Sequence, residues 1–212
     1  MRYKHIIWDW NGTLLDDTWL CVEGINQALI KRKLAPISEA TYREVFTFPV
    51  KDYYMKLGFD FNKEPFEIAG DEFVSYYGEN FHKTKLQNRS RFVLRAIHSN
   101  SISQSILSAG RQDFLLDWVS AHKLEKYFLK IVGIDNQYAN GKIEQGIKLI
   151  NDLPYNEEDI VIIGDTIHDS DVAEKLKINC VLIDHGHVSG ERLKKTGRKV
   201  FSNFRDLIPH IL

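Results

Sequence analysis

The sequence has little of what would mark a disulfide-rich, secreted or membrane protein. Among its 212 residues are only two cysteines, Cys21 and Cys180, which are far apart and match no metal-ligand spacing. Such a pair favours reduced, buried thiols over a disulfide, and we therefore expect a cytoplasmic protein. The apolar run Ile6-Ile7-Trp8 is too short for a signal peptide or a membrane span.

Neither sign of charge dominates the chain. It carries 28 Lys and Arg against 29 Asp and Glu, for a formal net charge of −1. A chain with this balance has no general attraction to nucleic acid or to an anionic membrane. Internal repeats and low-complexity tracts are also lacking, and the length suits one medium domain or a domain with an insertion. We expect a monomer that acts on a small molecule, with no nucleic acid or membrane partner.

What the chain does contain is a regular alternation of short apolar runs and helical patterns. This alternation is typical of an α/β protein with a Rossmann-like, doubly wound parallel sheet, which binds ligands at the carboxyl ends of its strands. The predicted strands span residues 5–8, 103–107, 129–133, 160–163 and 180–183. The predicted helices between them span residues 91–98, 111–122, 142–152 and 170–176.

One long segment breaks this rhythm. Residues 17–83 show no convincing strand and are rich in aromatic residues at helical spacing, such as Tyr42 and Phe46. We predict an all-helical cap over 17–83, inserted into a core domain formed by 1–16 and 84–212. Packing within the cap is the simplest role for its aromatic side chains.

The segment Asp9-Trp10-Asn11-Gly12-Thr13 follows the first predicted strand. Gly12 permits a tight turn in which backbone amides face an anion. An aspartate at the end of a buried strand can act as a nucleophile toward phosphorus and as a metal ligand. Taken alone, Asp9 could equally cap a turn.

Two further candidates lie downstream. Ser108 and the amide of Ala109 follow the second predicted strand, where they can bind phosphate oxygens at a helix start, although a serine there is also a common N-cap. Lys142 begins a predicted helix, where a cation opposes the helix dipole and calls for an anionic partner. A solvated surface lysine is the alternative.

The fourth segment contains a pair of acids. Asp165 ends the strand Ile160 to Ile163, and Asp169 lies four residues further on. Two neighbouring carboxylates are unfavourable unless a cation holds them, and oxygen ligands of this kind suit Mg²⁺. The alternative for Asp169 is a helix cap, and we expect His168 to be structural or exposed.

Together these four segments resemble the motifs of the haloacid dehalogenase superfamily, in particular its phosphoglycolate phosphatase-like members with a helical (C1-type) cap. The resemblance implies a Mg²⁺-dependent phosphatase that acts on a small phosphorylated metabolite through a phosphoaspartyl intermediate at Asp9. It also implies the ligands of the metal, which are Asp9, Asp165, Asp169 and the backbone carbonyl of Asn11. The implied contacts of the substrate are Ser108, Lys142, Trp10, Gly12, Thr13 and Ala109.

One residue departs from that pattern. Phosphatases of the family carry an aspartate two residues after the nucleophile, which donates and accepts the proton, and this chain has Asn11 there. An amide cannot carry that proton, whose transfer typically contributes roughly 10² to 10⁴-fold in rate. Three accounts stay open: a slow phosphatase, substrates with good leaving groups, or a different proton shuttle.

Other activities are compatible with Asn11. Phosphonoacetaldehyde hydrolase-like cleavage of a C–P bond uses a cap lysine as a Schiff base, and Lys51 is the candidate here. A regulatory or binding protein that has lost turnover is a third possibility. Dehalogenation is disfavoured, because it needs no metal and leaves Asp165 and Asp169 without a purpose.

Overall fold

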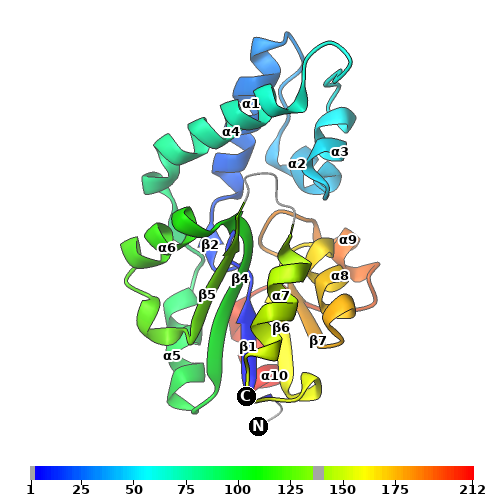
Figure 1. The fold of residues 1–212 in the computed structure, drawn as a ribbon. Helices are drawn as coiled ribbons and strands as arrows, with labels where there is room; N and C mark the ends of the chain where they lie inside the picture. Colours follow the sequence, from blue (N-terminus) through cyan, green and yellow to red (C-terminus); the bar gives the residue numbers. More distant parts are fainter. Residues whose placement is uncertain (1–2, 136–140) are drawn as a thin grey trace.

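The computed structural model describes residues 3–135 and 141–212. Its core is a six-stranded parallel sheet with the strand order β5-β4-β1-β6-β7-β8 (Figure 1). The central strand β1 pairs in parallel with β4 and β6. The six strands are β1 (His5–Trp8), β4 (Ser103–Arg111), β5 (Lys130–Ile134), β6 (Ile160–Gly164), β7 (Asn179–Ile183) and β8 (Lys199–Phe201).

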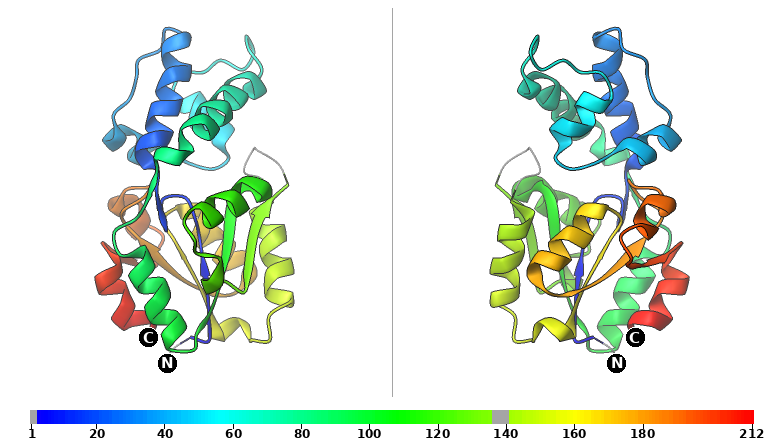
Figure 2. Two further views of the ribbon diagram at one scale, coloured as in Figure 1. Left: turned by 90° about the vertical axis from the view of Figure 1, so that its left-hand side faces the viewer. Right: turned by 90° about the vertical axis from the view of Figure 1, so that its right-hand side faces the viewer.

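Helices cover both faces of this sheet, as the two-residue period of β1 requires. Ile6 and Trp8 point into one apolar cluster with residues of α5, α6 and α10, while Ile7 points into another with α7 and α8. Figure 2 shows α5 and α10 on one face and α7 on the other. The core helices are α5 (Ser90–Ser99), α6 (Gln112–Ala121), α7 (Lys142–Asn151), α8 (Ile167–Leu176), α9 (Gly190–Lys194) and α10 (Phe204–Ile211).

A helical cap stands above the carboxyl ends of the central strands (Figure 1). The chain leaves the core through β2 (Leu15–Asp16) and returns through β3 (Lys85–Leu86), and these two short strands pair in antiparallel fashion. The predicted cap boundaries, after residues 16 and 83, fall at these strands. The cap consists of α1 (Thr18–Lys31), α2 (Glu39–Val45), α3 (Val50–Lys56), α4 (Phe66–Asn80) and the 3₁₀ turn η1 (Phe81–Lys83).

Polar contacts tie the end of α2 to the core. The Arg43 guanidinium lies 2.5 Å from the Asp184 carboxylate, which follows β7. From α9, the Arg192 guanidinium donates to the backbone carbonyls of Arg43 and Phe46, at 3.0 and 2.8 Å. The cap is therefore held against the core on the side of α9.

The predicted α/β fold with a doubly wound parallel sheet is confirmed. Each of the five predicted strands is present, and only β4 differs much in length, since it runs on to Arg111. The sequence analysis missed β8, whose three residues are exposed or half-buried at the edge of the sheet and lack a strong apolar pattern. No helix of the described residues is long and apolar enough to cross a membrane.

Candidate active site

Three aspartates meet at the carboxyl edge of the sheet. Asp9 follows β1, Asp165 follows β6, and Asp169 lies in the first turn of α8. Their carboxylate oxygens lie within 4.8 Å of one another, and all three side chains are buried. The parallel pairing of β1 with β6 brings the first two together, since parallel strands end at the same edge.

Each acid is held by specific donors. The Asp165 carboxylate accepts 2.6 Å hydrogen bonds from the Thr13 hydroxyl and from the backbone N–H of His187. The Asp169 carboxylate accepts from the amide and hydroxyl of Thr166, at 3.0 and 2.7 Å, in a capping box at the start of α8. Asp169 is therefore both a helix cap and a member of the acid cluster, and the two roles do not exclude each other.

Lys142 supplies the one ammonium group seen to pair with these acids in the described part of the chain. Its amine lies 2.6 Å from Asp9 Oδ1 and 2.6 Å from Asp169 Oδ1, and its side chain is only 2% exposed. Burial alone would lower the pKa of Lys142, but the two carboxylates raise it above its ordinary value. The lysine that begins α7 thus has the anionic partners that its position called for.

The acids exceed the positive charge that Lys142 provides. Burial raises the pKa of Asp9 to about 8 and that of Asp165 to about 6. Burial would also raise the pKa of Asp169, but Lys142 and the Thr166 hydrogen bonds hold it below its usual range. Three clustered carboxylates beside one ammonium group fit a divalent cation, and their hard oxygen donors suit Mg²⁺.

Asn11 faces the same cavity but is not free. Its side-chain amide donates to the Asp17 carboxylate at 2.7 Å and to the Tyr77 hydroxyl at 3.0 Å. The Tyr77 hydroxyl in turn donates to Asp17, also at 2.7 Å. Asn11, at the core, is thereby linked to α4 of the cap.

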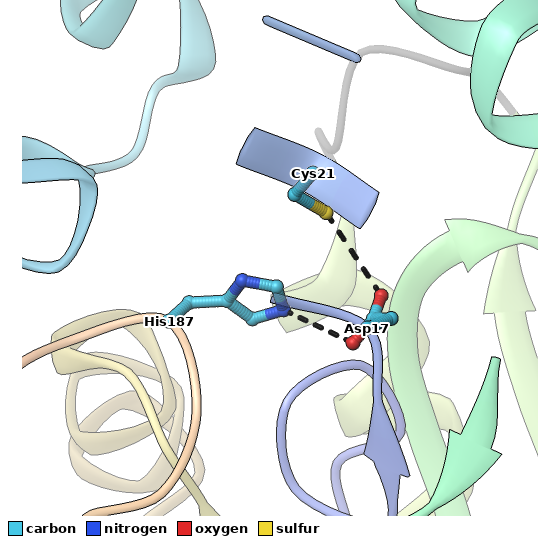
Figure 3. A group of neighbouring side chains, drawn as sticks. All are labelled: Asp17, Cys21 and His187. Atoms are coloured by element: carbon cyan, nitrogen blue, oxygen red, sulfur yellow. Dashed lines mark hydrogen bonds and ion pairs between the residues drawn. The ribbon is translucent and has the colours of Figure 1, made fainter. Parts of the chain in front are cut away.

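Asp17 is the centre of a second buried group, with Cys21 and His187 (Figure 3). The imidazole Nε2 of His187 lies 3.4 Å from Asp17 Oδ1, and its Nδ1 lies 3.0 Å from the Tyr42 hydroxyl of α2. Burial alone would lower the pKa of His187, but the Asp17 carboxylate raises it to about 9. His187 therefore carries a proton at neutral pH, and it joins the core to the cap.

This second group is poorly suited to a metal. The Asp17 carboxylate already accepts from Asn11, Tyr77 and the backbone N–H of Gly12. Burial raises the pKa of the Cys21 thiol well above its usual value, and a thiol binds metal as the thiolate. We therefore interpret Asp17 and His187 as an internal ion pair between the domains.

A cavity of about 200 Å³ lies between cap and core, and of the three acids Asp9 lines it. Ligand sites are usually roughly 300 to 1,000 Å³, so this one suits a small ligand. From the core, it is lined by Asp9, Asn11, Ser108, Ala109 and Lys142, among others. The cap side of the cavity is formed mostly by aromatic side chains of α2, α3 and α4 and of the segment between α2 and α3.

Ser108 lies at the cavity, but not at a helix start. It is still within β4, and α6 begins only at Gln112. Its hydroxyl accepts a 3.0 Å hydrogen bond from the backbone N–H of Gly110. The expectation of a helix N-terminus at Ser108 was wrong, because β4 continues past the small residues Ala109 and Gly110 to Arg111.

Several residues predicted to contact the substrate do not line the cavity. The Trp10 indole is fully buried in the core, with His122 as a ring neighbour at 6.1 Å, because its side chain points away from the turn. The backbone N–H of Gly12 donates to Asp17, and the Thr13 hydroxyl donates to Asp165. Both residues therefore hold buried acids in place without lining the cavity. Lys51 is exposed on α3, with its amine 5.6 Å from the centre of the Phe61 ring.

His168 lies at the boundary between the domains. Its ring packs 4.6 Å from that of Phe48 in the cap, and it lines the cavity. Burial lowers the pKa of His168 to about 4, so the imidazole is neutral near neutral pH. No role in the site was predicted from the sequence for Asp17, Tyr42, Tyr77 and His187.

The buried acids lie at the carboxyl edge of a parallel α/β sheet, beneath a helical cap, which is where proteins of this class bind their ligands. This chain belongs to the haloacid dehalogenase-like hydrolase family, whose family model matches residues 6–183. The predicted family is thus confirmed. A search of curated proteins found no match.

Solved structures share the whole fold at low sequence identity. A predicted phosphatase from Clostridium acetobutylicum is 19% identical, with a TM-score of 0.83, and the alignment covers 100% of this chain and 99% of that one. A predicted phosphoglycolate phosphatase from Haemophilus somnus 129PT is 16% identical, with a TM-score of 0.82 and the same coverage. A haloacid dehalogenase-like hydrolase from Bacteroides fragilis is 17% identical, with a TM-score of 0.84, covering 97% of this chain and 100% of that one.

Proposed function

We propose that this protein is a Mg²⁺-dependent phosphatase that hydrolyses a small phosphate monoester through a phosphoaspartyl intermediate at Asp9. One observation carries the proposal: Asp9 borders the cavity while Lys142 and the acids Asp165 and Asp169 surround its carboxylate. The names of similar folds, a predicted phosphatase and a predicted phosphoglycolate phosphatase, agree with it.

The first step transfers the phosphoryl group to the protein. An oxygen of the Asp9 carboxylate attacks phosphorus, a P–O bond to Asp9 forms, and the P–O bond to the alcohol part breaks with its electrons on the leaving oxygen. Lys142 stays charged and stabilises the negative charge on the phosphoryl oxygens. The Ser108 hydroxyl, which lines the cavity, is placed to donate to one of those oxygens.

The second step returns the carboxylate. Water attacks the phosphorus of the aspartyl phosphate, the P–O bond to Asp9 breaks with its electrons on the carboxylate, and inorganic phosphate leaves with the protons of that water. A Mg²⁺ ion held by Asp9, Asp165, Asp169 and the backbone carbonyl of Asn11 would offset the charge on the phosphoryl group. Asn11 cannot take a proton from the attacking water. We therefore expect that asparagine in place of aspartate slows this second step more than the first.

The C–P cleavage alternative requires an amine from the cap at the reacting centre. Among the described residues that line the cavity, Lys142 is the one lysine, and it belongs to the core and is paired with carboxylates. Lys51 is exposed and lies over Phe61. This arrangement supports hydrolysis of a phosphate ester over Schiff-base chemistry.

The proposal is tested by release of phosphate from a panel of phosphate monoesters, with Mg²⁺ and with excess chelator. We expect metal-dependent release that Asp9→Asn and Asp165→Ala abolish. Exposed Asp71→Asn, on α4, is the matched control, with unchanged release. Full activity in chelator would overturn the metal site, and binding without any turnover would favour a regulatory protein.

A further inference from the structure

We infer that the substrate is an aryl phosphate, a phosphate ester of a small uncharged phenol. This inference rests on the proposed function and names the substrate class of the same site. Four observations carry it: the aromatic walls of the cavity, the lack of an unpaired cation among the described residues that line it, an unpartnered buried hydroxyl and the amide at position 11.

The walls of the cavity suit a flat apolar group. The core contributes Phe114 and Trp118 of α6. Aromatic rings pack favourably in stacked or edge-to-face arrangements, so rings on several sides can enclose a further ring. The cap contributes Tyr42, Phe46, Phe48, Tyr53, Phe73 and Tyr77.

The cap side of the cavity carries no charge on the residues that the structure describes. None of its described lining residues is Lys, Arg, Asp or Glu. A carboxylate or a second phosphate on the substrate would therefore be buried there without a partner, which is strongly unfavourable. This feature argues against phosphorylated hydroxy acids and bisphosphates.

The cations that the core places at the cavity are already paired. Lys142 contacts two carboxylates, and His187 faces Asp17. The Arg111 guanidinium donates two 2.6 Å hydrogen bonds to Asp113, and it also lies 3.9 Å from the centre of the Phe114 ring. The described residues of the site thus offer one anion-binding position, for the transferred phosphoryl group.

Two buried polar groups of residues that line the cavity, the Tyr53 hydroxyl and His168 Nε2, lack a hydrogen-bond partner within the described part of the chain. The Tyr53 hydroxyl is buried and lines the cavity, and it makes no hydrogen bond within the described part of the chain. Buried hydroxyls are nearly always hydrogen-bonded, so a ligand is a natural partner for this one. We expect a polar, uncharged substituent on the ring of the substrate, within reach of Tyr53.

Asn11 points to the same class of substrate by an independent argument. A phenol leaves as a stabilised phenolate and needs little help from a proton donor, whereas an aliphatic alcohol needs a general acid at the leaving oxygen. Asn11 lines the cavity and has no proton to give. The chemistry at position 11 and the shape of the cavity therefore select the same leaving group.

Four esters separate these arguments when kcat and KM are measured with Mg²⁺: phenyl, benzyl and cyclohexylmethyl phosphate and 2-phosphoglycolate. Benzyl phosphate has the ring but an aliphatic leaving oxygen. We expect phenyl phosphate to exceed it in kcat by roughly 100-fold or more. Benzyl phosphate should have a KM a few-fold below that of cyclohexylmethyl phosphate. Its kcat/KM should exceed that of phosphoglycolate by at least about 100-fold.

Two variants test the walls. Val74→Arg places a cation in the half-buried cap side of the cavity and should lower kcat/KM for phenyl phosphate while raising it for phosphoglycolate. Ile68→Arg, on the exposed side of the same helix, is the matched control and should change neither value. Tyr53→Phe should weaken the binding of 4-hydroxyphenyl phosphate but not the binding of phenyl phosphate.

Binding of benzylphosphonate and phosphonoacetate, measured by calorimetry with Mg²⁺, separates a failure of this inference from a failure of the proposed function. Benzylphosphonate should bind at least about 10-fold more tightly. If no ester is hydrolysed but this preference holds, the phosphatase proposal fails and the ligand class stands. Faster turnover of phosphoglycolate than of phenyl phosphate, or tighter binding of phosphonoacetate, would overturn the aryl phosphate inference.

Discussion

The side-chain amide of Asn11 lies 2.7 Å from the Asp17 carboxylate and donates a hydrogen bond to it. Asn11 is therefore not simply an aspartate that lost its proton, because the amide fills a position that faces a buried anion. A carboxylate in its place would repel Asp17 at this distance. The structure thus gives Asn11 a role in joining the turn after β1 to the cap.

The first prediction concerns this pair. Asn11→Asp should lower the thermal stability progressively as the pH rises, because ionisation of the new carboxyl group beside Asp17 becomes increasingly unfavourable. Denaturation curves from pH 5 to pH 9 check this outcome. A stability deficit that does not grow with pH would show that the Asn11–Asp17 contact is of little consequence.

The exchange Asn11→Asp with Asp17→Asn restores one amide and one carboxyl, and Tyr77 can donate to the acid in its new position. The double variant should regain the part of the stability that repulsion between the two carboxylates removed, but not the part that Asp17 contributes by pairing with His187. It should also hydrolyse benzyl phosphate faster than the wild type by roughly ten-fold or more, because position 11 now holds an acid at the cavity. Asp17→Asn alone is the control. Equal rates for the double variant and the wild type would mean that position 11 does not reach the leaving oxygen.

Lys142 is the subject of the second prediction. Lys142→Met removes the ammonium group between Asp9 and Asp169 while keeping an unbranched side chain of similar length. Loss of one partner from a buried ion pair costs about 3 to 5 kcal/mol of unfolding free energy. Turnover should fall by about 100-fold or more, since a fixed charge at the phosphoryl group is lost. Exposed Lys148→Met on the same helix should affect neither property.

The third prediction is a pH dependence of the tie between His187 and Asp17. The folded-state pKa of His187 is raised to about 9, so its contribution to stability is full below the ordinary value of 6.5 and is lost as the pH rises through 9. Burial would raise the pKa of Asp17, but His187 and the neighbouring hydrogen bonds hold it below 3.8. The contribution of the ion pair to stability therefore persists as the pH falls to 3.8.

His187→Gln should therefore lower the unfolding free energy by about 3 kcal/mol at pH 6, and the difference from the wild type should shrink above pH 9. Urea denaturation in chelator at pH 6, 8 and 9.5 measures it. Exposed His82→Gln in the cap is the control. A deficit that stays constant over this range would rule out a charged His187 as the source of the effect.

The fourth prediction separates the proposed hydrolysis from Schiff-base chemistry. Lys51→Ala should leave kcat and KM for phenyl phosphate within about two-fold of the wild type, because the amine is exposed and lies outside the cavity. Borohydride with phosphonoacetaldehyde should trap no adduct in the wild type. An adduct that Lys51→Ala removes would favour cleavage of a C–P bond instead.

Much of the fold could be predicted because the central strands are short apolar runs with polar ends, as in Ile6-Ile7-Trp8. The pairing of Lys142 with carboxylates was also anticipated, since a cation at a helix start requires an anion. By contrast, β8 is a half-exposed edge strand without such a run. Ser108 was predicted to lie at a helix start because small residues that follow a strand are also common at the start of a helix.

The ion pair of Asp17 with His187 spans 170 residues of sequence and has no local pattern. The one available signal was that His187 follows a strand that ends at the edge where Asp9 and Asp165 lie. The exposed position of Lys51 was equally beyond the sequence, because the direction of a cap side chain depends on how α3 packs. The aromatic residues of the cap were predicted to pack within it. Their second role, as the wall of the cavity, depends on how the cap packs against the core.

The most direct test of the central claim is a rapid-mixing measurement of p-nitrophenolate release from p-nitrophenyl phosphate in Mg²⁺. Because the leaving group needs no acid and Asn11 supplies no base, phosphorylation should outrun hydrolysis. The account predicts a burst of about one p-nitrophenolate per active site, followed by slow turnover. During the slow phase, mass analysis should find a phosphoryl group on the peptide containing Asp9, and Asp9→Asn should abolish the burst. Metal-independent release, or a burst that survives Asp9→Asn, would contradict it.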